Sequence, residues 1–232
     1  MAETGILLGT AITLALSHTL IGVDHYIPFI ALSKANNWTI RKTIYVVLIC
    51  GFGHVLGSVI LGIIGITLFM QVTSFDGIQD IRDDIATYVL IAFGLIYTIY
   101  GIINAVKNKP HTHMVLDGQA IIHSHSHNGE DHEHKTKKTS SAFWGLFIFF
   151  VLGACKPIIP LMMKIAAENN IFTLVLITVS FSVFTVSTML LMTLLGVKGI
   201  QLIKTDKLER YAHLIAGSAV LVCGLAVLLL PI

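Results

Sequence analysis

The chain has 232 residues, of which 55% are hydrophobic and only 12% are charged, and its mean hydropathy is +0.82. So few charges cannot cover the surface of a soluble domain, and this composition is typical of a polytopic membrane protein. We therefore expect a lipid bilayer as the main partner, no nucleic-acid partner and no enzymatic activity.

Six apolar segments are long enough to cross a bilayer. They lie at about 5–32, 43–70, 85–106, 142–165, 171–196 and 208–231. We predict an all-α fold with six transmembrane helices, joined at 71–84 by an acidic connection and at 164–170 by a short turn. Residues 1–106 then form a first three-helix repeat, 107–141 a polar loop, and 142–232 a second three-helix repeat.

The basic residues predict the orientation of these spans. Twelve of the 15 Lys and Arg residues lie in the first, third and fifth connections, and two lie in the second and fourth. Because cytoplasmic loops are enriched in Lys and Arg, the odd connections should be cytoplasmic and both termini outside. The sequence thus predicts a multi-pass protein of the cytoplasmic membrane, with the loop 107–141 in the cytoplasm.

An odd number of spans in each half predicts an inverted repeat. The first span contains Gly22-Val23-Asp24-His25-Tyr26-Ile27-Pro28, and the fourth contains Gly153-Ala154-Cys155-Lys156-Pro157-Ile158-Ile159-Pro160. Both have a glycine, then a polar pair, then proline. Since proline removes a helical hydrogen bond, we expect the first and fourth helices to be broken, with freed carbonyls near both breaks.

The first span carries the strongest candidate site, which consists of His18, Asp24 and His25. An Asp inside a bilayer costs about 3 kcal/mol, so it is usually functional. Carboxylate and imidazole are ligands for divalent transition metals. On a continuous helix the two histidines are about 10 Å apart, too far to share one ion. Either the helix unwinds near Gly22, or each histidine serves a separate station, or further ligands come from another helix.

The second span adds His54, with Ser58 one helical turn away. His54 is either a hydrogen-bonded packing residue or a third ligand facing His25 or His18, and we favour the ligand. Near the start of the last span, we predict that His213 lies at the membrane–water interface. The alternative is that His213 lines a pathway through the membrane.

The second half contributes Cys155 and Lys156 as candidate pathway residues. Cys155 is either a soft ligand or a small apolar side chain. An ammonium group in a membrane needs a partner, and an ion pair between Lys156 and Asp24 is the main structural alternative to a metal-binding Asp24.

The polar loop 107–141 is rich in histidine, with Glu130, Asp131 and Glu133 interleaved. Such a tract indicates metal binding and is too polar to pack, so we predict a disordered metal-binding loop. Its histidines are His111, His113, His123, His125, His127, His132 and His134.

The stretch from His18 to His25 resembles the His…Asp-His signature of the nickel/cobalt transporter superfamily, especially its urease-accessory-like membrane proteins and nickel/cobalt efflux permeases. Val23 stands where proline is common in that group. The stretch Gly53-His54-Val55 with Gly57-Ser58 is similar to the second-span motif, and the stretch Gly153–Pro160 is weakly similar to the second half. The resemblance implies His18, Asp24, His25 and His54 as metal-binding residues. The superfamily is also related to thiol-electron carriers and to exporters of sulfite and organic anions.

The leading hypothesis is therefore a secondary transporter of a divalent transition metal, Ni²⁺ or Co²⁺ with Zn²⁺ as a further candidate. The metal is substrate, and no cofactor is expected to be permanently bound. Protons are the expected coupling ion, since metal displaces them from imidazole, and export is slightly favoured over uptake. The alternatives are an anion or sulfur-compound exporter that uses Lys156, a membrane thiol-electron carrier, and a non-transporting partner that delivers metal to an accessory system.

Overall fold

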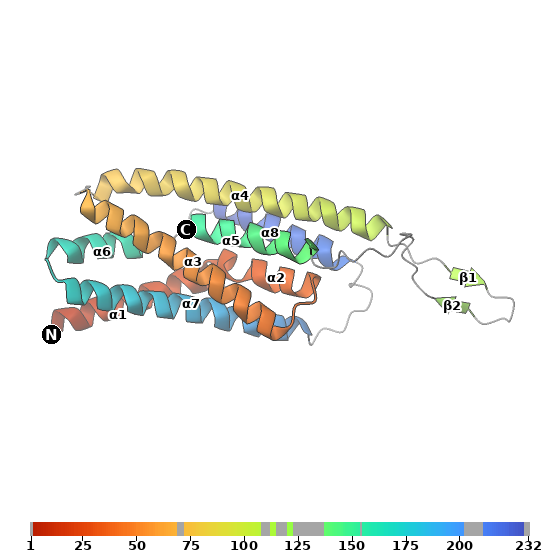
Figure 1. Ribbon diagram of the computed structural model, residues 1–232, viewed down its shortest axis with the longest axis horizontal. Coiled ribbons are helices and arrows are strands. Elements are labelled where there is room, and N and C mark those ends of the chain that lie inside the picture. Colours follow the sequence, from red (N-terminus) through yellow and green to blue (C-terminus); the bar gives the residue numbers. More distant parts are fainter. Residues whose placement is uncertain are drawn as a thin grey trace.

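The computed structural model describes residues 2–68, 72–107, 112–114, 120–122, 137–153, 155–201 and 211–229. The chain forms an elongated bundle of helices, with a small β-hairpin that projects from one end (Figure 1). Within these residues, five helices are long and apolar enough to cross a membrane: Glu3–Ile21, Ile40–Thr67, Gly77–Val106, Ile171–Ile200 and Ala212–Leu229. Two shorter apolar helices cover Phe143–Leu152 and Ile158–Ala167.

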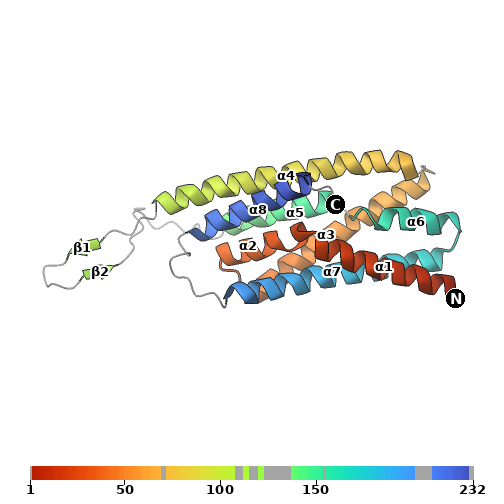
Figure 2. The ribbon, with the colours of Figure 1, turned by 180° about the vertical axis from the view of Figure 1, so that it is seen from behind.

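The first predicted span is two helices in succession, α1 (Ala2–Ile21) and α2 (Ile27–Ala35), with the 3₁₀ turn η1 (Val23–His25) between them. The fourth predicted span is likewise divided, into α5 (Lys137–Leu152) and α6 (Ile158–Ala167). Both interruptions lie near the middle of the bundle's long axis (Figures 1 and 2). The predicted breaks in the first and fourth helices are thus present in the fold.

The other long helices are α3 (Ile40–Thr67), α4 (Val72–Lys107), α7 (Ile171–Gln201) and α8 (Ala212–Leu229). The prediction of an acidic connection at 71–84 is wrong, because residues 72–84 form the first turns of α4. No proline interrupts this segment, and Ile78, Ile81 and Ile85 recur at helical spacing. The polar residues therefore extend a helix instead of ending it.

Within the predicted loop, β1 (Thr112–Met114) pairs antiparallel with β2 (Ala120–Ile122). The intervening sequence carries Asp117-Gly118, a dipeptide typical of hairpin turns. These six residues and the start of α5 at Lys137 thus have regular structure within the range 107–141 that we predicted as a loop, and the disorder of that loop stays a prediction.

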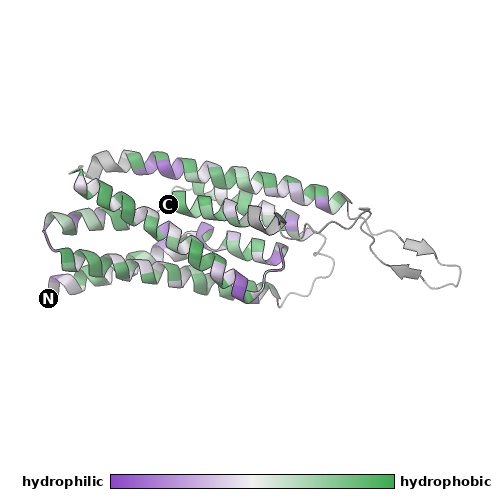
Figure 3. Ribbon diagram, viewed as in Figure 1, coloured by the Kyte–Doolittle hydropathy of each residue, from purple (hydrophilic) through white to green (hydrophobic). Residues whose placement is uncertain are grey.

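Many large apolar residues are exposed on the bundle, as expected for helices that face lipid, and hydrophobic residues predominate along the helices (Figure 3). Inside the bundle are two apolar clusters. One surrounds Phe29, Cys50, Phe150 and Cys223, and the other contains Ala11, Ala15, Cys155, Met162 and Phe181. The two interrupted helices contribute to both clusters, so their breaks are enclosed by protein, where irregular backbone is tolerated in a membrane.

Helices α4 and α8 pack so closely that glycine is needed at the contact. A Cβ atom added at Gly94 would lie 2.6 Å from the Leu221 amide nitrogen, and one added at Gly217 would collide with the backbone of Thr98. Small residues at such positions allow helix backbones to approach each other. This contact joins the last helix of each half of the chain.

Candidate metal site

The interruption of the first helix brings His25 back toward His18. Gly22 donates its amide to the His18 carbonyl at 3.0 Å, and the His25 amide donates to the Gly22 carbonyl at 3.0 Å. A Cβ atom at Gly22 would lie 2.5 Å from His25 Nδ1. Pro28 lies in the first turn of α2, where a missing amide hydrogen costs little. Of the three arrangements considered from the sequence, the fold combines two: the helix unwinds at Gly22, and further candidate ligands come from other helices.

Three imidazole rings consequently lie close together. The ring centroids of His18 and His25 are 4.7 Å apart, and those of His25 and His54 are 5.1 Å apart, both in edge-to-face geometry. His25 and His54 are each only 4% exposed. The predicted approach of His54 on α3 to the first-span histidines is therefore present in the fold.

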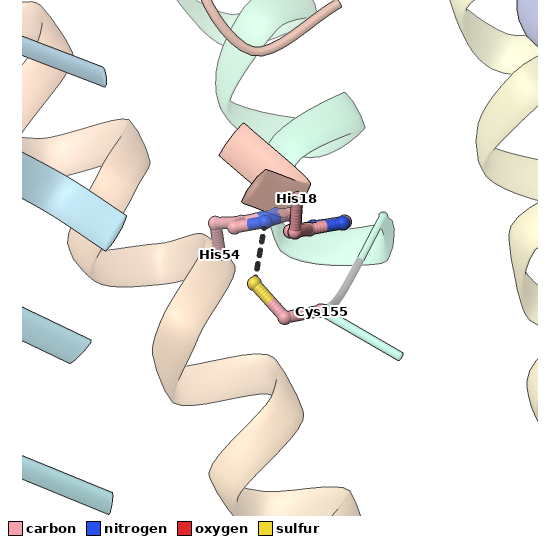
Figure 4. A group of neighbouring side chains, drawn as sticks. All are labelled: His18, His54 and Cys155. Carbon is pink, nitrogen blue, oxygen red and sulfur yellow. Dashed lines mark hydrogen bonds between the residues drawn. The ribbon is translucent and has the colours of Figure 1, made fainter. Parts of the chain in front are cut away.

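Cys155, in the gap between α5 and α6, completes a compact group of possible ligands. Its Sγ lies 3.0 Å from His54 Nε2 (Figure 4). One ligand atom each from His18, His54 and Cys155 lies within 4.8 Å of the others. In a tetrahedral zinc site two ligand atoms are about 3.5 Å apart, so a shift of roughly 1 Å would bring all three to one ion.

Hydrogen bonds from Ser58 tie this gap to α3. The Cys155 amide donates to Ser58 Oγ at 2.7 Å, and Ser58 Oγ in turn donates to the His54 carbonyl at 3.2 Å. Ser58 thus satisfies a buried backbone amide where the helix is broken. Its contribution is to position Cys155 beside His54.

The hydrogen bonds also indicate which ring nitrogens carry hydrogen. His54 Nδ1 is 3.1 Å from the Phe150 carbonyl, and His25 Nδ1 is 3.0 Å from the Gly22 carbonyl. A carbonyl only accepts, so both Nδ1 atoms must donate, and in the neutral rings both Nε2 atoms keep a lone pair. Metal-binding histidines commonly hold their second nitrogen in this way.

Two of the Nε2 atoms are buried without a hydrogen-bond partner among the described residues, those of His18 and His25. A buried polar atom left unpaired costs about 1–3 kcal/mol unless something binds it. Together with the fixed rings, these atoms make the cluster suitable for a cation that accepts imidazole nitrogen.

Asp24 lies beside the cluster. Its Oδ1 is 3.2 Å from His25 Nδ1, so it accepts a hydrogen bond from the ring or forms an ion pair with it if the ring is protonated. It is not a member of the compact group of ligand atoms. In this arrangement Asp24 orients His25, whereas the sequence suggested direct ligation.

The proposed ion pair between Asp24 and Lys156 does not form. Lys156 Nζ instead lies 3.1 Å from both Asp80 Oδ1 and Asp83 Oδ2 on α4. Sequence reasoning missed these partners because it placed Asp80 and Asp83 in a connection. The expectation that proline frees the Lys156 carbonyl is also wrong, since that carbonyl accepts from the Ile159 amide at 3.3 Å.

The remaining predicted residues lie elsewhere. His213, at the start of α8, has its Nδ1 2.9 Å from the Tyr97 hydroxyl, and Tyr97 also accepts from Asn36. This contact joins helix ends near the β-hairpin. Among the loop histidines, His113 lies in β1 and its side chain is not described. The other six lie outside the described residues: His111, His123, His125, His127, His132 and His134.

Two features of the site were not apparent from the sequence. The Phe150 carbonyl orients His54, and Cys155, for which the sequence left a soft ligand and a small apolar side chain as alternatives, is grouped with His18 and His54. The signal available for Cys155 was its position at the start of the Pro157-x-x-Pro160 break.

Comparisons with protein-family models, curated proteins and solved structures gave no match.

Proposed function

We propose that this protein is a secondary transporter that moves a divalent transition-metal cation of the Ni²⁺ and Co²⁺ type across the cytoplasmic membrane. The observation that carries the proposal is the cluster of imidazoles at His18, His25 and His54, with the buried Nε2 atoms of His18 and His25 unpaired among the described residues, at the break of a membrane-length helix. A site near the middle of broken helices is the usual form of a transporter's substrate site.

A sixth span, formed by α5 and α6 together, is part of the proposal. Each broken helix is followed by the same kind of turn, since Asn37 after α2 has a φ of 50° and Asn169 after α6 has a φ of 56°. Two pairs of helix contacts correspond as well: α1 packs on α7 as α5 packs on α3, and α2 packs on α7 as α6 packs on α3. These correspondences support two inverted repeats with the metal site between their breaks.

The orientation follows from the distribution of charge. The α2–α3 connection and the carboxyl-terminal ends of α4 and α7 lie at one end of the bundle, and the amino terminus lies at the other (Figures 1 and 2). The basic connections are at the first of these ends, so we place it in the cytoplasm and both chain termini outside. The histidine-rich loop would then collect metal for export, coupled to protons.

The test is metal flux into proteoliposomes of defined orientation, with Ni²⁺, Co²⁺, Zn²⁺ and Mn²⁺ offered separately. We expect flux of at least one ion by the wild type and loss of about tenfold or more in His54→Gln, because a ligand is removed. Monodisperse elution and an unchanged thermal midpoint serve as folding controls for the variant.

The competing functions give different results in the same assay. If no divalent ion moves, or if His54→Gln transports as well as the wild type, the proposal is wrong. Flux of sulfite or an organic anion that is abolished in Lys156→Gln would then identify an anion exporter. A thiol-electron carrier that uses Cys155 needs a second thiol beside it, but Cys50 and Cys223 pack in a different apolar cluster from Cys155.

A further inference from the structure

We infer that Cys155 binds the transported cation through its sulfur, so that the substrate class is thiophilic: Zn²⁺, Co²⁺, Ni²⁺ or Cd²⁺ in preference to Mn²⁺ or Mg²⁺. That the bound cation is also the transported one rests on the proposed function. Metal binding by Cys155 does not depend on it. Such binding makes one ligand come from the second half of the chain and the others from the first half.

The sulfur of Cys155 faces a histidine nitrogen, unlike the other two cysteines. A buried free cysteine is ordinarily a small apolar side chain, and Cys50 and Cys223 fit that description within their apolar cluster. Cys155 differs because its Sγ lies 3.0 Å from His54 Nε2, the nitrogen left with a lone pair when Nδ1 donates to Phe150. Its thiol therefore faces a ligand atom.

The backbone of Cys155 is held in place at the break between two helices. The residue lies between the end of α5 at Leu152 and the start of α6 at Ile158, and the Ser58 hydroxyl holds its amide at 2.7 Å. The side chain itself is fully buried. The hydrogen bond between the Cys155 backbone amide and Ser58 thus holds the thiol in place and leaves its sulfur available, as expected for a preorganised ligand.

An independent observation points to a ligand at the same place. The ring of His25 contacts those of both His18 and His54, is 4% exposed and is anchored through Nδ1 to the Gly22 carbonyl. Its Nε2 is buried without a hydrogen-bond partner among the described residues, as is that of His18. A cation bound at this cluster by imidazole and sulfur would supply a partner of the kind that such a buried nitrogen lacks, although His25 itself is not a member of the compact group of His18, His54 and Cys155.

The chemistry of this set defines the substrate class. Imidazole binds Zn²⁺, Ni²⁺ and Co²⁺, and thiolate adds selectivity for soft and borderline ions over Mn²⁺ and Mg²⁺, which prefer oxygen. Sulfur binds as thiolate, so the S–H bond breaks, its proton leaves to solvent, and a metal–sulfur bond forms. No oxidant or reductant is required.

The test uses the purified full-length chain titrated with Co²⁺. Thiolate bound to Co²⁺ gives a near-ultraviolet charge-transfer absorption that imidazole and carboxylate do not give, so the loop histidines cannot produce it. We expect this absorption in the wild type, in Cys50→Ser and in Cys223→Ser, and its loss in Cys155→Ser. The affinity ratio of Cd²⁺ over Mn²⁺ should fall about tenfold or more in Cys155→Ser alone.

The inference is overturned if the wild type lacks the absorption, or if Cys155→Ser keeps it. Cys155→Ala serves as a second variant if Cys155→Ser fails to fold. The outcome is separable from that of the proposed function. Absorption without flux supports sulfur ligation and contradicts transport, whereas flux of Ni²⁺ or Co²⁺ without the absorption contradicts only the role of Cys155.

Discussion

At the scale of single residues, the site depends on groups that hold the candidate ligands in place. The Phe150 carbonyl holds His54, Gly22 and Asp24 hold His25, and Ser58 holds the backbone of Cys155. Each of these partners leaves one ligand atom free for the centre of the cluster. Substitutions of the partners should therefore alter metal binding without removing a ligand.

Ser58→Ala tests this expectation. Removing the hydroxyl leaves the buried Cys155 amide without its acceptor, which should lower the free energy of unfolding by about 1–3 kcal/mol. Metal flux should fall as well, because Cys155 loses its support. The measurement is the denaturation midpoint of the purified protein together with its flux.

The matched control is Ser182→Ala on α7. The Ser182 hydroxyl donates to the Thr178 carbonyl one turn earlier, so its removal leaves no buried donor unpaired. We expect little change in either measurement. Equal effects of the two substitutions would argue against a special role for Ser58.

Asp24→Asn separates the orienting role of the carboxylate from direct ligation. The amide oxygen can still accept from His25 Nδ1, but the charge near the ring is lost. Substitution of such an outer partner typically costs 10–100-fold in metal affinity, so we expect transport with a raised KM and a smaller change in kcat. Complete loss of transport in a folded Asp24→Asn protein would instead indicate that Asp24 binds the ion directly.

At the scale of elements, the decisive feature is the interruption of the first membrane helix. Val23–His25 form a 3₁₀ turn, and α2 resumes at Ile27 with Pro28 in its first turn. Gly22 makes this possible, because its missing side chain leaves space for the His25 ring. The same break shortens the distance between His18 and His25 enough for their rings to touch.

Gly22→Ala should therefore displace His25. The added Cβ would lie 2.5 Å from His25 Nδ1 and 2.9 Å from the His18 carbonyl. We expect a loss of metal affinity of about tenfold or more, measured by flux at subsaturating metal.

Gly9→Ala, in α1, is the control for this substitution. A Cβ atom there meets nothing within 4 Å, and alanine in a helix interior is favoured by roughly 0.5–1 kcal/mol over glycine. Flux should be unchanged or slightly higher in this variant. A comparable loss in both variants would contradict the packing argument.

At the scale of the whole molecule, the proposal requires the histidine-rich loop and the α6–α7 turn to face opposite sides of the membrane. Single cysteines at Ser124 and Glu168 provide the test. In intact cells, an impermeant thiol reagent should label Glu168→Cys and should reach Ser124→Cys only after permeabilisation. Labelling of Ser124→Cys in intact cells would reverse the proposed orientation.

Much of the architecture follows from the composition of the chain and from the positions of its helix-breaking glycine and proline residues. Long apolar runs specify membrane helices, and Gly22 with Pro28 and Gly153 with Pro157 mark the two breaks, because these residue types disfavour continuous helix. The acidic segment before residue 85 was wrongly predicted as a connection between helices. Its polarity indicates where a bilayer span ends, but not where a helix ends. The α4 helix simply continues past it.

The site was predicted only in part. His18, His25 and His54 were recognisable because imidazoles are rare in apolar spans, and their proximity in the fold agrees with that prediction. Their grouping with Cys155, and the pairing of Lys156 with Asp80 and Asp83, depend on contacts between residues about 70 to 140 positions apart. Local sequence patterns do not indicate which residues so far apart in the chain come into contact.

The sequence by itself determined the apolar helices, their two breaks and the candidate ligands, because these depend on local chemistry. Only the tertiary structure decided which ligands meet, because packing of the two halves sets that geometry.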